Sequence, residues 1–340
     1  MDENAQFVIR PIRKEDADSF YAFAQKAALG ITSMPKNQAL LEEKIQQSLL
    51  SFTTIQPDGS EYYLFVLSNI KSNEVVGVCG ISSCMAWKNS KTLYKTIKLE
   101  QYLDFPAQLT LNLLEKTSIS QGPSELCSLY LNPGHRKEGL GKLLSLSRLL
   151  FIASFPLRFQ NKLIAEMRGF VDANNASPFW EGIGRKFLNL SFQDLMPLAE
   201  LKREIISSYL PSFPIPIDLL PIEVQQSIGM MHPRTLPAFE MLQHEGFKTT
   251  PLIDLFDGGP VIEANIENIL TIQTSQIFQV ADIVPQVTDK SLTLISNTSL
   301  DYRCCTGSVS SLSKERVSIP TSVADALEVK TGDIIRWRVL

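Results

Sequence analysis

Residues 124–144 read SELCSLYLNPGHRKEGLGKLL, which predicts a strand, a basic glycine-containing loop and the start of a helix. Amides at the N-terminus of a helix have no partner within the helix, so they bind an anion where no side chain blocks its approach. Gly139 and Gly141 lack blocking side chains, and Arg136, Lys137 and Lys142 add positive charge. The stretch therefore predicts a phosphate site that suits a pyrophosphate better than a carboxylate.

Two other common phosphate-binding patterns are missing from this loop. The dinucleotide pattern Gly-x-Gly-x-x-Gly does not occur, and no Gly-Lys-Ser/Thr follows as in a Walker loop. The spacing Arg136-x-x-Gly139-x-Gly141 instead resembles the acyl-CoA pyrophosphate loop of the GCN5-related N-acetyltransferase superfamily. In that superfamily the loop follows the fourth strand and opens the long central helix. A glycine-rich turn with a solvated basic edge is the alternative interpretation.

Composition points to an ordinary soluble protein of two or three units. The chain has 340 residues, of which 44% are hydrophobic and 20% charged, and its formal net charge is -4. An acidic chain lacks the electrostatic footprint expected for extended nucleic acid. We expect no membrane span and no signal peptide, and so a cytoplasmic location. Five cysteines without a Cys-x-x-Cys pair and only three histidines argue against disulfides and against a metal site.

The chain on either side of this loop reads as alternating strands and helices. Strands are expected at 7–11, 62–67 and 74–82 and helices at 14–24 and 37–50, whereas 86–123 reads as an irregular insertion. The helix after the glycine loop should run from about 139 to 155, and a strand parallel to 124–131 should follow at 163–171.

Two segments that begin with proline, 178–187 and 237–247, resemble each other and predict a repeated terminal helix-strand step. Two tandem acyltransferase units would explain this similarity, and two unrelated amphipathic helices are the alternative. The predicted fold is therefore α/β, an acyl-CoA N-acyltransferase fold that is tandem in this reading. Its parts are an acyl-CoA-binding domain (1–192), a degenerate second half (193–260) and a small C-terminal β-barrel or swapped-hairpin domain (261–340).

The C-terminal residues 315–337 predict a strand, a one-turn helix, a Gly-Asp turn and a closing strand. This pattern also resembles certain dimeric DNA-binding hairpins. Because the charge of the chain argues against DNA, we expect a structural or oligomerising role for this part.

Six ordered blocks of the chain resemble the arginine N-succinyltransferase family, alpha-chain type, over nearly the full length. The blocks are LGITSMP (29–35), 124–142, AEMRG (165–169), SPFW (177–180), HPRT (232–235) and FDGGP (256–260). The resemblance implies transfer of a succinyl group from succinyl-CoA to the α-amino group of L-arginine, with ornithine as an alternative acceptor. A diverged acyl-CoA sensor or scaffold without activity is the rival interpretation. A homodimer or a heteromer with a paralogous chain is expected, without metal, nucleic acid or membrane.

The family resemblance also implies two site residues. The proton donor of the family falls on His232, and its succinyl-CoA contact falls on Leu129. An imidazole suits a proton transfer near neutral pH, and a backbone amide on the strand of Leu129 could hold the thioester oxyanion. Glu125 is a candidate to polarise the amine, with an ion pair to Arg168 as the alternative. Cys127 has no evident base beside it, so we expect direct transfer.

An amino-acid substrate needs a cation for its carboxylate and acids for its guanidinium. Arg168 or Arg234 is a candidate for the first role. Glu166, Asp254 and Asp257 are candidates for the second, although Asp257-Gly258-Gly259 also reads as a tight turn.

Overall fold

The computed structural model describes the whole chain except residues 1–4, 28–32, 103–107, 137–138 and 290. Its strands are β1 (Phe7–Pro11), β2 (Tyr62–Asn69), β3 (Val75–Ser82), β4 (Lys91–Tyr102), β5 (Gln108–Ile119), β6 (Ser124–Leu131), β7 (Lys162–Glu166), β8 (Ile215–Pro216), β9 (Lys248–Ile253), β10 (Pro260–Asn265), β11 (Gln276–Val284), β12 (Thr293–Asn297), β13 (Cys304–Gly307), β14 (Ser310–Ser311), β15 (Arg316–Pro320) and β16 (Ile334–Val339). Its α-helices are α1 (Ala17–Lys26), α2 (Gln38–Thr53), α3 (Leu140–Ser154), α4 (Pro178–Gly182), α5 (Arg185–Leu188), α6 (Phe192–Tyr209), α7 (Ile222–Ser227), α8 (Leu236–His244), α9 (Leu270–Thr274) and α10 (Thr321–Leu327).

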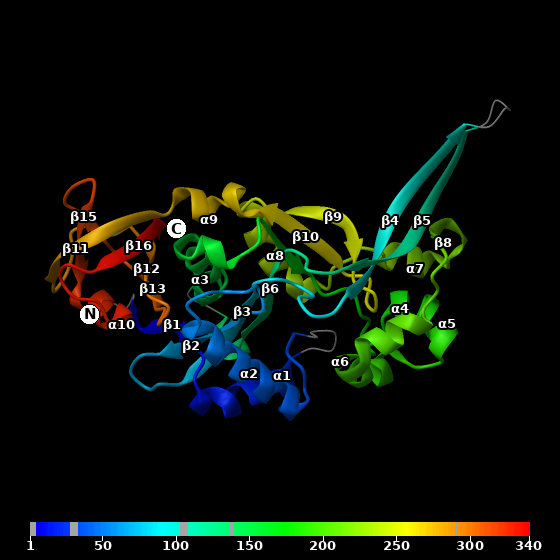
Figure 1. Ribbon diagram of the computed structural model, residues 1–340, viewed down its shortest axis with the longest axis horizontal. Helices are drawn as coiled ribbons and strands as arrows, with labels where there is room; N and C mark the ends of the chain where they lie inside the picture. The colour runs from blue at the N-terminus through cyan, green and yellow to red at the C-terminus, as the bar shows by residue number, and fades with distance from the viewer. Residues whose placement is uncertain (1–4, 28–32, 103–107, 137–138, 290) are drawn as a thin grey trace.

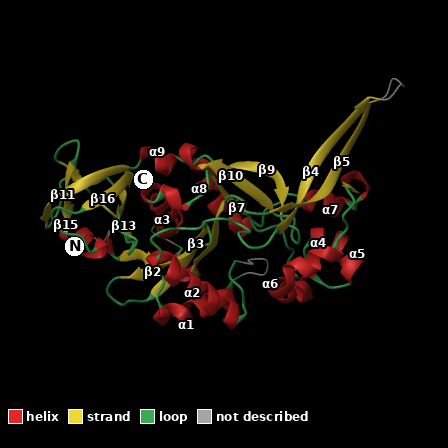
Figure 2. Cartoon of the chain, viewed as in Figure 1, coloured by secondary structure: helices red, strands yellow, loops and turns green. Residues whose placement is uncertain are grey.

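All of these strands join one 16-stranded sheet that runs along the molecule (Figures 1 and 2). Their order is β14-β15-β11-β16-β12-β13-β1-β2-β3-β6-β7-β10-β9-β4-β5-β8. The C-terminal strands form one end of the molecule, and the β4–β5 hairpin projects from the other end (Figure 1). The prediction of an α/β fold is confirmed, and the predicted strands 7–11, 62–67 and 74–82 correspond to β1, β2 and β3.

The centre of the sheet is buried on both faces, because successive residues of its strands direct apolar side chains to opposite faces. Along β2, Tyr63, Phe65 and Leu67 pack with α3 on one face. Tyr62, Leu64 and Val66 pack with α1 and α2 on the other face. This arrangement explains why the strand reads as a continuous apolar run, and it fixes the register of its neighbours.

Strand β6 leads through the glycine loop into α3, as the sequence predicts. It lies parallel to β7, with Ser124, Glu125 and Leu126 paired to Leu163, Ile164 and Ala165. Strand β7 ends at Glu166, earlier than the predicted end at 171. After Glu166, the Met167 amide still donates to the Pro260 carbonyl of the neighbouring β10, and the Gly169 amide donates to the Asp257 side chain.

The expectation of an irregular insertion at 86–123 is wrong. Strands β4 and β5 pair in unbroken register from Lys91↔Ile119 to Tyr102↔Gln108. The hairpin has few other strand partners, because β4 pairs with β9 only at Tyr94 and Lys95 and β5 pairs with β8 only at Leu113 and Leu114. Most of the hairpin is therefore a two-stranded ribbon. One face of this ribbon carries Ile97, Leu99, Leu111 and Leu113, whereas Lys98 and Asn112 lie on the other, so the alternation typical of a strand is present in the sequence.

Residues 193–260 connect back to the same sheet. Strand β10 pairs with β7 on one edge and with β9 on the other. Helix α8 leads into β9, which is the helix-strand step expected for the second proline-led segment. In the first segment, α4 and α5 lead instead into another helix, α6, so the two segments do not share a helix-strand step. The tandem arrangement and the domain boundaries after residues 192 and 260 stay predictions.

The C-terminal strand, short helix and closing strand predicted within 315–337 are confirmed as β15, α10 and β16. This part attaches to the rest of the sheet through β13, which pairs with β1 at Ile9↔Cys304. The Tyr302 hydroxyl donates to the Ser147 carbonyl of α3 at 2.9 Å. The predicted closure of this region into a barrel stays a prediction.

Candidate functional site

The predicted phosphate loop brings its glycines to the N-terminus of α3. Gly139 caps the helix with φ 76°, a left-handed conformation that favours glycine. A Cβ at Gly139 would meet no described atom within 4 Å, so none of the described residues blocks the approach to the first amides of α3. Arg136 and Lys142 are exposed on either side, and the Arg136 Nε donates to the Leu131 carbonyl at 3.2 Å. Lys137 falls outside the described residues.

Gly141 is the second residue of α3 and so lies in its first turn. A Cβ there would stand 3.9 Å from Leu131 Cδ2, in ordinary contact. The predicted anion-binding residues therefore lie together, around helix amides that carry the positive end of the helix dipole. The donor set fits a diphosphate, because it combines backbone amides with two flexible cations.

A β-bulge interrupts β6 just before this loop. The register with β3 passes from Val78↔Tyr130 to Gly80↔Cys127, so Ser128 and Leu129 together face Cys79. Ser128 adopts φ 52°, which turns the backbone at the bulge. The Ser128 amide and hydroxyl donate to the Ser33 hydroxyl and carbonyl, each at 3.0 Å. Leu129, the predicted succinyl-CoA contact, thus sits in a locally distorted strand.

Strands β6 and β7 separate beside the bulge. Their parallel pairing covers Ser124 to Leu126 only, and β7 ends at Glu166. The Cys127 carbonyl accepts from the guanidinium of Arg148 at 3.5 Å. A strand whose neighbour departs presents backbone donors and acceptors along one edge, where an extended ligand can bind.

A polar cluster surrounds the bulge on the side of α2. We define it by the residues shown together or acting on one another there: Lys44, Tyr62, Lys91, Glu125, Cys127, Ser128, Glu166, Arg203 and Asp254. The Tyr62 hydroxyl lies 2.8 Å from Ser128 Oγ and accepts from the Cys127 thiol at 3.5 Å. Burial raises the pKa of the Cys127 thiol, so it stays protonated and does not act as a nucleophile.

Two carboxylates of the polar cluster share one lysine. The Lys91 ammonium lies 3.6 Å from Glu125 Oε1 and 2.5 Å from Glu166 Oε1. Burial, followed by the charge of Glu125, raises the pKa of Glu166, while Lys91 opposes that shift. Glu125, the predicted catalytic carboxylate, is therefore held by Lys91 at the base of the hairpin. A raised pKa makes the neighbouring Glu166 a stronger base than an ordinary carboxylate.

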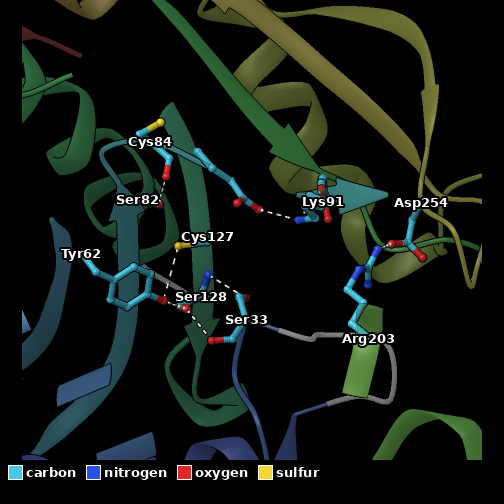
Figure 3. A network of polar contacts seen from close by, with 11 residues as sticks. Ser33, Tyr62, Ser82, Cys84, Lys91, Cys127, Ser128, Arg203 and Asp254 are labelled. Carbon is cyan, nitrogen blue, oxygen red and sulfur yellow. Dashed lines mark hydrogen bonds and ion pairs between the residues drawn. The ribbon is translucent and has the colours of Figure 1, made fainter. Parts of the chain in front are cut away.

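Arg203 reaches the polar cluster from α6, on the side of Lys91 (Figure 3). Its Nη2 donates to Asp254 Oδ2 at 2.8 Å, and its guanidinium lies 4.6 Å from the centre of the Phe256 ring. Lys44, Lys91 and Arg203 were not predicted as site residues from the sequence. Lys91 lies within 86–123, the segment predicted to be an irregular insertion, so its position beside two carboxylates was not predicted. For Lys44 and Arg203, the sequence indicates only a charged residue within a helix, which does not mark a functional site.

His232, Arg168 and Arg234 meet where β7 ends. The His232 amide donates to the Arg168 carbonyl at 2.9 Å, and the Arg234 amide donates to His232 Nδ1 at 3.1 Å. An Nδ1 that accepts a bond leaves the proton of the neutral ring on Nε2. Burial lowers the pKa of His232, and Arg168 and Arg234 lower it further. His232 is thus a neutral imidazole with an Nε2–H donor.

Asp257 forms the turn that the sequence offered as an alternative to substrate binding. Its carboxylate is buried and accepts from the Gly169 amide at 2.8 Å and from the Gly259 amide at 2.9 Å. The backbones approach so closely that a Cβ on Gly259 would stand 2.1 Å from the Met167 carbonyl oxygen. Both carboxylate oxygens are engaged, so Asp257 positions the Arg168 segment.

The described residues form neither a metal-binding group nor a helix that could span a membrane. No group of three or more His, Cys, Asp or Glu side chains is placed to hold a metal ion in the described ranges. Within the same part of the chain, no helix has the length and apolar character needed to cross a membrane.

Comparisons with known proteins cover almost the entire chain. The family model described as "Arginine N-succinyltransferase beta subunit" matches residues 7–271, and the model of its C-terminal domain matches residues 276–337. A curated relative from Shigella sonnei, named "Arginine N-succinyltransferase", is 33% identical over 97% of this chain and 96% of its own length. A relative with the same name from Escherichia coli strain SE11 shows the same identity and coverage.

A solved structure supports the same relationship. The arginine/ornithine succinyltransferase subunit AI from Pseudomonas aeruginosa superposes with a TM-score of 0.91 at 29% identity and covers 98% of both chains. The sequence resemblance is therefore confirmed, although the matching model is described as the beta subunit where we expected the alpha-chain type. The chain belongs to the arginine N-succinyltransferase beta subunit family.

Proposed function

We propose that this protein transfers the succinyl group of succinyl-CoA to the α-amino group of L-arginine. The single observation that carries this proposal is the opening between β6 and β7, with a bulge at Ser128 and Leu129 and an uncovered helix N-terminus directly after it. The names of the relatives supply the substrates, since they describe arginine N-succinyltransferases.

The acyl donor binds along the edge of β6 and over the N-terminus of α3. The amides next to Gly139 and Gly141 receive the diphosphate, and the exposed Arg136 and Lys142 add charge to the same place. The extended pantetheine arm then follows the edge that β7 leaves free. This places the thioester beside Leu129, whose amide is the candidate donor to the carbonyl oxygen.

The reaction forms an amide bond and breaks a thioester bond. The neutral amine attacks the thioester carbon, and the resulting oxyanion is held by the backbone at the bulge. The Glu125 and Glu166 pair beside Lys91 takes the proton that the amine loses. Collapse of the tetrahedral intermediate releases the CoA thiolate, and His232 donates a hydrogen bond from Nε2 to the charge that develops there. Arg168 and Arg234, beside His232, are candidates for the carboxylate of arginine.

The setting of the enzyme is also part of the proposal. We place it in the cytoplasm, where succinyl-CoA is found, as a homodimer or with a paralogous subunit. The C-terminal strands, 261–340 in the predicted division, contribute to that assembly.

A turnover screen tests the proposal. Purified protein is mixed with succinyl-CoA and arginine, ornithine or lysine, and released thiol is measured together with the mass of the product. We expect succinylated arginine and thiol in equal amounts. Tight CoA binding without turnover on any amine would favour the sensor interpretation and contradict the proposed function.

A further inference from the structure

Four cationic side chains reach the polar cluster, namely Lys44, Lys91, Arg203 and Arg148, whose guanidinium donates to the Cys127 carbonyl at 3.5 Å. Two of them have acidic partners. Lys91 is held by Glu125 and Glu166, and Arg203 is held by Asp254. Lys44, on α2, makes no ion pair with any described residue. Its contact is the face of Tyr62, where Nζ lies 4.4 Å from the ring centre. The cluster therefore holds one ammonium whose charge the described part of the protein does not neutralise.

Lys44 stands close to the place proposed for the acyl group. The ring under its ammonium belongs to Tyr62, and the hydroxyl of that ring lies 2.8 Å from Ser128 Oγ at the bulge. A succinyl group bound with its thioester carbonyl beside Leu129 has a carboxylate about 4–5 Å from that carbonyl carbon. The Tyr62 side chain thus connects the bulge, through its hydroxyl, with Lys44, which lies over its ring.

We propose that Lys44 is a carboxylate-binding residue of the substrate site. Its ammonium pairs with a substrate carboxylate that enters the polar cluster, either the free carboxylate of the succinyl group or the α-carboxylate of the amino-acid acceptor. The inference rests on the proposed function, because both carboxylates come from the substrates of that reaction.

The environment of Lys44 supports this role. Burial lowers the pKa of its ammonium, and the charge of Lys91 lowers it further, while Cys127 and Glu125 oppose the shift. A partly buried charge without a counter-ion is costly, and an arriving carboxylate removes that cost. The contact with Tyr62 holds the ammonium in position meanwhile, as a cation over an aromatic face.

Pairs of substrates that differ by one carboxylate test the assignment. Succinyl-CoA is compared with acetyl-CoA, and arginine with agmatine, which is arginine without its carboxylate. The variants are Lys44→Met and Lys44→Gln, which remove the charge, and Lys44→Arg, which keeps it. Lys26→Met, an exposed lysine on the neighbouring α1, is the matched control. Two neutral variants are used so that poor folding of one leaves the other.

We expect the neutral variants to lose on the order of 100-fold in kcat/KM for the substrate whose carboxylate Lys44 binds, and under about 3-fold for its partner without that carboxylate. A loss confined to succinyl-CoA identifies the acyl carboxylate, and a loss confined to arginine identifies the α-carboxylate. Lys44→Arg should restore most of the activity. Equal losses on all four substrates, or no loss, would overturn the assignment.

Binding without an acceptor separates this inference from the proposed function. Calorimetry gives Kd for succinyl-CoA and acetyl-CoA on the wild type and on each variant. Where Lys44 binds the acyl carboxylate, the preference for succinyl-CoA disappears in Lys44→Met even if no amine is turned over. If the wild type releases thiol but the substrate ratios do not change in the variants, the function stands and the role of Lys44 fails.

Discussion

His232 shows how a local hydrogen bond decides the role of a catalytic candidate. The Arg234 amide occupies Nδ1, and burial and two nearby guanidinium groups lower the pKa of the ring. An imidazolium, the usual proton donor, would have to break the bond at Nδ1 and stand beside two other cations. The geometry instead favours a neutral ring that stabilises developing charge through Nε2–H.

This assignment gives a pH dependence with a definite sign. Protonation of His232 removes its neutral form, so kcat should fall as the pH drops through the lowered pKa, below the ordinary 6.5. His232→Gln keeps an amide donor near Nε2 and cannot titrate, so it should lose this acid limb. His232→Ala removes the donor and should lower kcat by about 100-fold. Profiles of kcat against pH check both variants.

A neighbouring cation provides the control for that profile. Arg234→Gln removes one of the charges that lower the pKa of His232, so the acid limb should move to higher pH. Arg316→Gln, at an exposed site on β15, should leave it in place. An unchanged profile in Arg234→Gln would show that another group titrates.

Among the elements, α3 has the clearest functional end. Gly139→Ala places a Cβ on a residue with φ 76°, which costs about 1–2 kcal/mol, and disturbs the cap where the diphosphate is proposed to bind. We expect at least a tenfold rise in Kd for CoA, measured by calorimetry. Gly134→Ala is the matched control in the same loop, because its Cβ would meet nothing within 4 Å and its φ is not left-handed. Equal CoA affinity in both variants would contradict the diphosphate site.

The same elements show what could be predicted from the sequence. The strand, glycine loop and helix at 124–154 were predictable because each carries a local signal, apolar strand residues, glycines and a helical run. The hairpin of β4 and β5 was not predicted, although Ile97, Leu99, Leu111 and Leu113 alternate with polar residues along its strands. The roles of Lys91 and Arg203 could not be predicted, because Lys91 meets Glu125, and Arg203 meets Asp254, only after distant segments come together. His232 was found through the family block, and its neutral state required the Arg234 amide.

At the scale of the whole molecule, the C-terminal strands belong to the same packed body as the acyltransferase sheet. Leu294, Tyr302 and Cys304 share one apolar core with Leu150 and Phe151 of α3. Family models divide the chain between residues 271 and 276, but this core crosses that division. Cooperative unfolding of both parts is the physical consequence, since neither can expose its share of the core without the other.

The ion pair of Arg338 and Glu245 offers the test of that cooperativity. Arg338 Nη1 lies 2.6 Å from Glu245 Oε1, and Glu245 is 1% exposed. Arg338→Ala leaves a buried carboxylate without its cation, so the free energy of unfolding should fall by about 3 kcal/mol or more. Arg316→Ala, exposed on β15, is the matched control and should change it by under about 0.5 kcal/mol. In calorimetry, Arg338→Ala should shift one single transition to lower temperature. A second transition that appears in the variant while the first stays in place would show that the C-terminal part unfolds independently, because a cooperative body responds to the loss of one buried pair as a whole.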